Sequence, residues 1–86
     1  MNYGKGSEFL KALAHPMRLR MVEGLMSHEC NVDRIMKALK LPQSTVSQHL
    51  AILRNKGIVV MRKDGVKTCY CVKDPKVITL IKLLQE

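Results

Sequence analysis

The chain has 86 residues, 47% of them hydrophobic, and its 15 Lys and Arg against seven Asp and Glu give a net charge of +8. This length fits one small domain, expected over residues 1–86, with a narrow margin of stability. The excess of positive charge favours a polyanionic partner. No apolar run approaches the roughly 20 residues of a membrane span, and a signal peptide is absent, so we expect a cytoplasmic protein that binds no membrane.

Local signals predict two helices in the first third of the chain. Residues 1–6 contain two glycines and little that can pack, and they are expected to fray. Ser7 is expected to cap a short helix that ends just before Pro16, because the residue before a proline is displaced from helical geometry. Pro16 then suits the first position of a second helix, predicted over 16–27. Gly24 costs that helix about 1 kcal/mol relative to Ala, which indicates a close helix crossing.

The middle of the chain predicts a helix-turn-helix. Apolar residues recur from Val32 at helical spacing, with Asn31 as the expected N-cap. A further helix is predicted over 43–55, after a turn of only a few residues, and Gly57 is expected to end it. Two short helices joined so tightly make a helix-turn-helix unit.

The outer side of the 43–55 helix is short, polar and nearly uncharged. Such side chains can reach base edges in a major groove, whereas long charged ones contact phosphates instead. An ordinary amphipathic helix with a polar outer face is the alternative. The candidates for base contacts are Gln43, Ser44, Ser47 and Gln48. Thr45 and His49 are assigned to the DNA backbone, and a half-buried packing role for His49 stays equally open.

A β-hairpin is predicted after this helix. Residues 58–63 and 66–72 are rich in β-formers, and the Asp64-Gly65 pair between them is a strong hairpin signal. Basic side chains at the hairpin tip and beside the 43–55 helix are expected to reach phosphates or a flanking minor groove. A tip that is merely basic and solvated is the alternative. The candidate phosphate contacts are Lys40, Arg54, Arg62, Lys63 and Lys67.

The last helix is expected to mediate dimerisation. It begins at Asp74-Pro75, and its apolar residues are spread too widely around the helix to form a single face that a small monomer could bury. We therefore predict a homodimer that assembles through the first and last helices. The candidate interface residues are Phe9, Leu10, Leu13, Val77, Leu80, Ile81 and Leu84.

This order of elements resembles the ArsR/SmtB family of bacterial winged-helix repressors. The resemblance rests on Leu-Lys-Ala-Leu-Ala-His-Pro-Met-Arg-Leu at 10–19, Gln-Ser-Thr-Val-Ser-Gln-His-Leu-Ala-Ile-Leu at 43–53, Gly-Ile-Val at 57–59, and Tyr70. It implies an α+β, mostly helical winged helix-turn-helix with about five helices and a two-stranded wing. It also implies a homodimer that binds an imperfect palindrome in double-stranded DNA and represses transcription, often until an inducer, here unknown, releases it.

The chain departs from the family at its two metal sites. Where relatives have Cys-x-Cys-Asp, this chain has Val32 in place of the second cysteine, and its last helix contains no His or Cys. We therefore expect no metal, no cofactor and no switching by zinc, since the remaining thiols leave a tetrahedral site incomplete.

The three cysteines leave one regulatory alternative open. In the register that an Asp64-Gly65 turn sets, Lys63 lies opposite Val66, and Cys69 and Cys71 share a charged face assigned to solvent. Exposure and cationic neighbours favour thiol reactivity. The possible thiol sensor comprises Cys30, Cys69 and Cys71, although Cys30 reads more readily as a core residue. The alternative is thus the same repressor switched by thiol oxidation or a thiophilic metal.

A different class of function is a winged-helix module for protein association or RNA binding, which would leave the polar helix face unused for bases. An enzyme is not expected. The acidic residues are scattered, and the sequence shows neither a nucleophile–base pair in a recognisable setting nor a glycine-rich phosphate loop.

Overall fold

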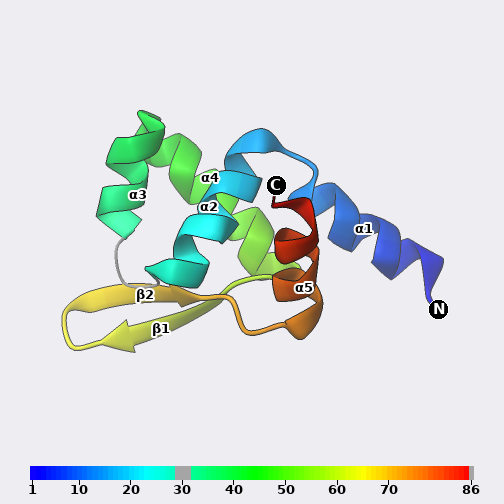
Figure 1. Ribbon diagram of the computed structural model, residues 1–86. Coiled ribbons are helices and arrows are strands. Elements are labelled where there is room, and N and C mark those ends of the chain that lie inside the picture. Colours follow the sequence, from blue (N-terminus) through cyan, green and yellow to red (C-terminus); the bar gives the residue numbers. More distant parts are fainter. Residues whose placement is uncertain (29–31, 86) are drawn as a thin grey trace.

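The computed structural model describes residues 1–28 and 32–85. Within them, five helices and one two-stranded antiparallel sheet form the predicted winged helix-turn-helix (Figure 1). The hairpin extends from one side of the helical body and α1 from the other. In chain order the elements are α1 (Tyr3–Leu13), α2 (Pro16–Ser27), α3 (Val32–Leu39), α4 (Gln43–Asn55), β1 (Val60–Asp64), β2 (Lys67–Cys71) and α5 (Pro75–Leu84).

The predicted start of α2 is confirmed. Pro16 occupies the first turn, and the N–H of Met17 donates to Nδ1 of His15 at 3.1 Å. The start of α5 follows the same logic, because Oδ1 of Asp74 accepts from the N–H of Lys76 at 2.9 Å. In both cases a side chain satisfies an amide that the first turn of a helix leaves unpaired.

The predicted start of α1 at Ser7 was wrong. The helix begins at Tyr3, and the Asn2 side chain caps it by accepting from the N–H of Lys5 at 3.0 Å. Asn is as good an N-cap as Ser. The helical cost of Gly4 and Gly6 does not prevent the first turns from forming, so the expectation that the first six residues fray does not hold from Tyr3 onward.

The turn between α3 and α4 contains a feature that the sequence does not indicate. Lys40 has a φ of 55°, and its N–H bonds to the carbonyl of Met36 at 3.0 Å, which ends α3. A residue with a Cβ pays about 1–2 kcal/mol for this left-handed conformation. Pro42 follows as the N-cap of α4 and gives no side-chain hydrogen bond. The predicted cap at Asn31 lies outside the described residues.

The end of α4 is a Schellman motif at the predicted glycine. Gly57 has a φ of 72°, its N–H bonds to the carbonyl of Arg54, and the N–H of Ile58 bonds to the carbonyl of Leu53. Ile58 and Leu53 are both fully buried. The motif therefore satisfies the last carbonyls of α4 and directs the chain into the core before the wing begins.

The predicted register of the wing was wrong by two residues. Arg62 lies opposite Cys69, and the two-residue loop is Gly65-Val66 instead of Asp64-Gly65. The favoured two-residue hairpin turns need a positive φ at the first loop position, and Gly65, at 64°, supplies it. A shift of two residues leaves the same side chains together on each face of the hairpin.

The predicted solvent face of β2 is buried. Cys69 is 0% exposed and Cys71 is 2% exposed, whereas Thr68 on the opposite face is exposed. Strand β2 packs against α2, while β1 is exposed along its whole length. The charges that marked this face as outward, such as Arg62 and Lys67, belong to β1 and to the strand end, beyond the region that α2 covers.

The predicted close crossing at Gly24 is confirmed. A Cβ placed on Gly24 would lie 3.3 Å from both Cγ1 and Cδ1 of Ile35 on α3, which is tighter than most packed contacts. Glycine therefore allows α2 and α3 to approach closely, and this approach fixes the position of the first helix of the helix-turn-helix.

Gly24→Val should lower the free energy of unfolding by about 1–3 kcal/mol, because the added methyl groups overpack the contact with Ile35. Chemical denaturation measures the effect. Ala38→Val, at an exposed position of α3, controls for the helix propensity of valine. Ile35→Val in the Gly24→Val background should cost less than it does in the wild type. Additive effects of these two substitutions would contradict the crowding argument.

Candidate nucleic-acid interface

The outer face of α4 is exposed as predicted. Val46, Leu50 and Leu53 are buried and seat the helix on the core. The opposite side presents Gln43, Ser44, Ser47 and Gln48, all exposed. These four residues are called the α4 face below. The face bears hydroxyl and amide groups and no charge, so its members can donate and accept hydrogen bonds at close range.

His49 is half-buried, and its ring contacts Arg18 of α2 and His15, which agrees with the packing alternative left open by the sequence. Its ring centroid lies 4.6 Å from that of His15, and Nη1 of Arg18 lies 3.4 Å from its Nδ1. Burial lowers the pKa of His49, and the neighbouring His15 and Arg18 lower that pKa further. The ring is therefore directed at α2 and away from the α4 face. Thr45, the other predicted backbone contact, is also half-buried.

Positive charge concentrates on the helix-turn-helix and the wing. Residues 32–71 contain eight Lys and Arg but only two Asp, which accounts for six of the eight net charges of the chain. All the basic residues predicted to contact phosphate are exposed: Lys40, Arg54, Arg62, Lys63 and Lys67. Nη1 of Arg54 also contacts Sδ of Met61 at 3.8 Å and so links the end of α4 to β1.

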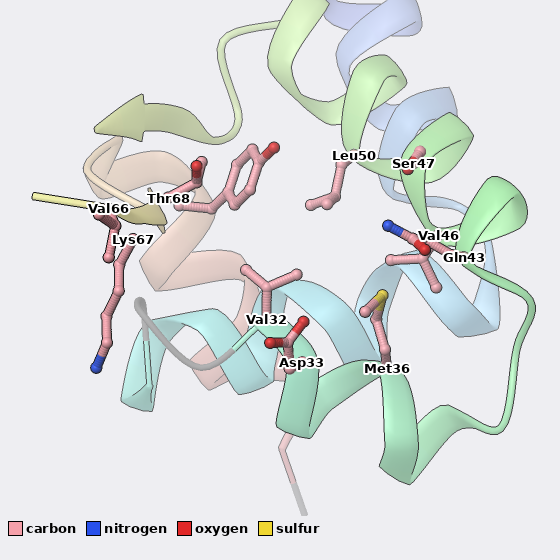
Figure 2. A pocket seen from close by; sticks show the side chains of 11 residues that line it. Val32, Asp33, Met36, Gln43, Val46, Ser47, Leu50, Val66, Lys67 and Thr68 are labelled. Carbon is pink, nitrogen blue, oxygen red and sulfur yellow. The ribbon is translucent and has the colours of Figure 1, made fainter. Parts of the chain in front are cut away.

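A hollow of about 550 Å³ separates α4 from the wing (Figure 2). Gln43 and Ser47 border it from α4, and Thr68 borders it from β2. The carboxylate of Asp33 points into it from α3. The complete lining is Val32, Asp33, Met36, Gln43, Val46, Ser47, Leu50, Val66, Lys67, Thr68 and Tyr70.

Two hydroxyl groups beside the α4 face were missed as site residues. Thr68 and Tyr70 both line the hollow, and Tyr70 also borders a smaller one with Ser47 and Arg54. The alternation of β2 had placed Thr68 and Tyr70 on one face, but only the fold shows that this face is turned toward α4.

An exposed apolar surface lies on α1 and α5. Leu10 is 55% exposed, Leu83 75% and Leu84 63%. These three leucines are called the α1–α5 patch below. Phe9, Leu80 and Leu83 border a hollow of about 440 Å³ beside it.

The predicted dimerisation residues therefore divide into two groups. Leu13, Val77 and Ile81 are buried within the protomer, so their assignment to a dimer surface was wrong. Leu10 and Leu84 are exposed as expected, and Phe9 and Leu80 are half-buried. Leu83 was not among the candidates, although it is the most exposed leucine of α5.

The cysteines differ from the exposed thiols that the sequence predicted, because Cys69 is disulfide-bonded. Switching of the repressor by thiol oxidation therefore stays a prediction. Cys69 and Cys71 are buried, so the argument from exposure was wrong, and Cys30 lies outside the described residues. Across residues 1–28 and 32–85, no three His, Cys, Asp or Glu side chains gather closely enough to hold a metal ion. No helix in the same part of the chain is both long and apolar enough to cross a membrane.

Residues 15–60, which include the helix-turn-helix and the start of the wing, match the family model for bacterial regulatory proteins of the arsR family. The chain belongs to the ArsR family. It is 46% identical over 85 residues to the transcriptional repressor PagR of Bacillus anthracis, and this match covers 98% of the chain and 85% of PagR.

Solved structures agree with the fold. The crystal structure of PagR superposes with a TM-score of 0.84 over 95% of this chain and 94% of that one, at 46% identity. HlyU from Vibrio cholerae gives a TM-score of 0.86 at 36% identity, over 98% and 94% of the two chains. A homodimeric winged helix-turn-helix DNA-binding domain from Mycobacterium bovis gives 0.83 at 29% identity, over 95% and 76%. The resemblance drawn from the sequence is confirmed, and this ArsR-family chain is a transcription regulator with a DNA-binding fold.

Asp33→Asn should raise affinity for any DNA duplex by about two- to fivefold at low salt, because it removes negative charge beside the α4 face. Asp33 also lies in the first turn of α3, where a carboxylate stabilises the helix by about 0.3–1 kcal/mol, so stability should fall slightly. Fluorescence anisotropy and thermal melting measure the two effects. Glu23→Gln on α2 is the control for charge, and an equal gain in affinity there would contradict a local effect.

Proposed function

We propose that this ArsR-family regulator is a homodimeric transcriptional repressor that binds an imperfect palindrome in double-stranded DNA. Helix α4 lies in the major groove, and the wing contacts the adjacent backbone. The observation that carries this proposal is the uncharged α4 face, exposed within a region that otherwise concentrates positive charge. Its amides and hydroxyls fit base edges, whereas the surrounding Lys and Arg fit phosphates.

The start of α4 supports a backbone contact beside the bases. Pro42 gives no side-chain cap, so the first amides of α4 keep their hydrogen-bonding capacity. The N-terminus of a helix of this length favours an anion such as a phosphate. Lys40, exposed in the preceding turn, adds a cation at the same end of the helix.

Relatives support repression as the outcome of binding. PagR, at 46% identity, is a repressor, whereas the Vibrio cholerae HlyU, at 37% identity, is a transcriptional activator. One fold therefore serves both outcomes. The higher identity favours repression here.

Ser47→Ala and Gln48→Ala should each weaken binding to the preferred site and relax base preference there by about 1–3 kcal/mol. Lys67→Ala should weaken binding to all sequences and reduce the slope of log K against log salt by about one phosphate. Selection from a random duplex pool supplies the preferred site, and anisotropy titrations at several salt concentrations measure the affinities.

Lys73→Ala, exposed and outside the wing strands, is the matched control for charge. Equal losses on specific and random DNA for all three site variants would contradict the division between base and phosphate contacts. Binding of single-stranded or duplex RNA as tight as that of the selected DNA would instead favour the RNA module.

The α1–α5 patch is proposed as the centre of the dimer interface. Its three leucines are 55–75% exposed, and the two helices that bear them meet at the hollow bordered by Phe9, Leu80 and Leu83. The homodimeric Mycobacterium bovis domain shares this fold, which supports the same assembly here.

Leu83→Lys with Leu84→Lys should convert the dimer to a folded monomer of 9.8 kDa. Neither side chain is needed in the protomer core, so helical circular dichroism should persist. Sedimentation velocity at micromolar concentration gives the mass. Val66→Lys, at the fully exposed hairpin tip, removes a comparable apolar group and should remain dimeric. A wild type that sediments only as a monomer would refute the interface.

A further inference from the structure

Arg18 connects three helices through one guanidinium group. From α2, its Nε donates to the carbonyl of Ala12 at 2.6 Å, and its Nη2 donates to the carbonyl of Lys11 at 3.4 Å. Its Nη1 lies 3.4 Å from Nδ1 of His49 on α4. Ala12 and Lys11 belong to the last turn of α1, where the helix dipole favours a cation.

The contact with Arg18 favours one protonation state of the His49 ring. A guanidinium offers only donors, so Nδ1 of His49 must accept, and the remaining proton must lie on Nε2. Protonation would place an N–H and a positive charge directly against Arg18. The other ring at this position is that of His15, 4.6 Å away and tilted by 56°, and it is itself held by the N–H of Met17.

We propose that Arg18 and His49 form a positioning pair that sets the orientation of α4 against α1, and so aims the α4 face at the DNA. The inference rests on the proposed function. The pair influences DNA binding indirectly, through the position of α4, because Arg18 is half-buried and the His49 ring is directed at α2. In this proposal neither residue contacts DNA, which replaces the backbone contact that the sequence predicted for His49.

The pair also links the DNA-reading helix to the dimer surface. Leu10 of the α1–α5 patch immediately precedes Lys11, whose carbonyl Arg18 binds. In a dimer assembled through α1, the last turn of α1 is fixed relative to the partner protomer. Because Arg18 contacts both this turn and His49 on α4, it holds α4 in position relative to α1. The angle between the α4 helices of the two protomers then depends on Arg18.

Acidification should therefore weaken specific binding. The charged groups that act on His49 are Arg18 from α2 and His15 from the segment before it, and both disfavour its protonated form. Because the pKa of folded His49 is lowered, the unfolded chain takes up the proton first. The His49 contribution to stability is complete above the unfolded pKa of 6.5 and is lost as the pH falls below it. The positioning of α4 is lost at a lower pH, where the ring of the folded protein itself takes up a proton.

The variants Arg18→Gln, Arg18→Lys and His49→Asn test the pair. Arg18→Gln should lower the affinity for the selected duplex about tenfold, because the three acceptors lose the guanidinium group that binds them. The mass of the dimer and the salt dependence of binding should stay unchanged. The affinity of Arg18→Lys should lie between those of the wild type and Arg18→Gln, since an ammonium group cannot reach all three acceptors. Arg20→Gln removes the same charge from an exposed position of α2 and is the matched control. It should change the affinity only through the lower net charge.

His49→Asn keeps an acceptor near Nδ1 but cannot be protonated. It should bind like the wild type at pH 7.5 and lose the fall in affinity that the wild type shows as the pH is lowered below 6.5. Thermal melting over the same range should show the same difference.

Three outcomes would overturn the inference. These are wild-type affinity in Arg18→Gln, a salt slope reduced by about one in that variant, which would mark a direct phosphate contact, or an unchanged pH profile in His49→Asn. Failure of the wild type to select any duplex would instead refute the proposed function, so the two failures remain distinguishable.

Discussion

The apolar seat of α4 is the constraint on which the rest of the structure depends. Three buried residues at helical spacing, Val46, Leu50 and Leu53, hold the helix against the core. The Schellman motif at Gly57 then turns the chain back, so that Ile58 packs beside Leu53 before the wing begins. With both its rotation and its end fixed, α4 can present a polar face on which no residue is required for stability. Under the proposed function, the α4 face can therefore change with the operator while the fold stays constant.

The sequence predicted those parts of the molecule that local chemistry decides. Helices α2 and α4, the tight turn between α3 and α4, and the stop at Gly57 follow from proline placement, helical periodicity and a glycine with positive φ. Each signal acts within a few residues of the structure it determines. The exposed α4 face followed directly, because a buried stripe on one side of a helix leaves the other side outward.

Features that depend on contacts between distant segments were not predicted. Which face of β2 is buried depends on α2, and charges at the strand ends gave the opposite impression. Helix α5 carries apolar residues on all its sides. The sequence therefore could not distinguish side chains buried in the protomer, such as Val77, from exposed ones available to a partner, such as Leu83. The role of His49 depends on Arg18, 31 positions away, and no local pattern reports that contact.

The left-handed backbone at Lys40 has an evolutionary consequence. Glycine would adopt this turn with little strain, yet the chain keeps a cationic side chain there, beside the start of α4. Under the proposed function, selection for a stable fold and selection for affinity toward DNA act in opposite directions at Lys40. Small domains have little stability to spare. Divergence among relatives at this turn should therefore track the temperature at which each host grows and the occupancy that its promoter demands.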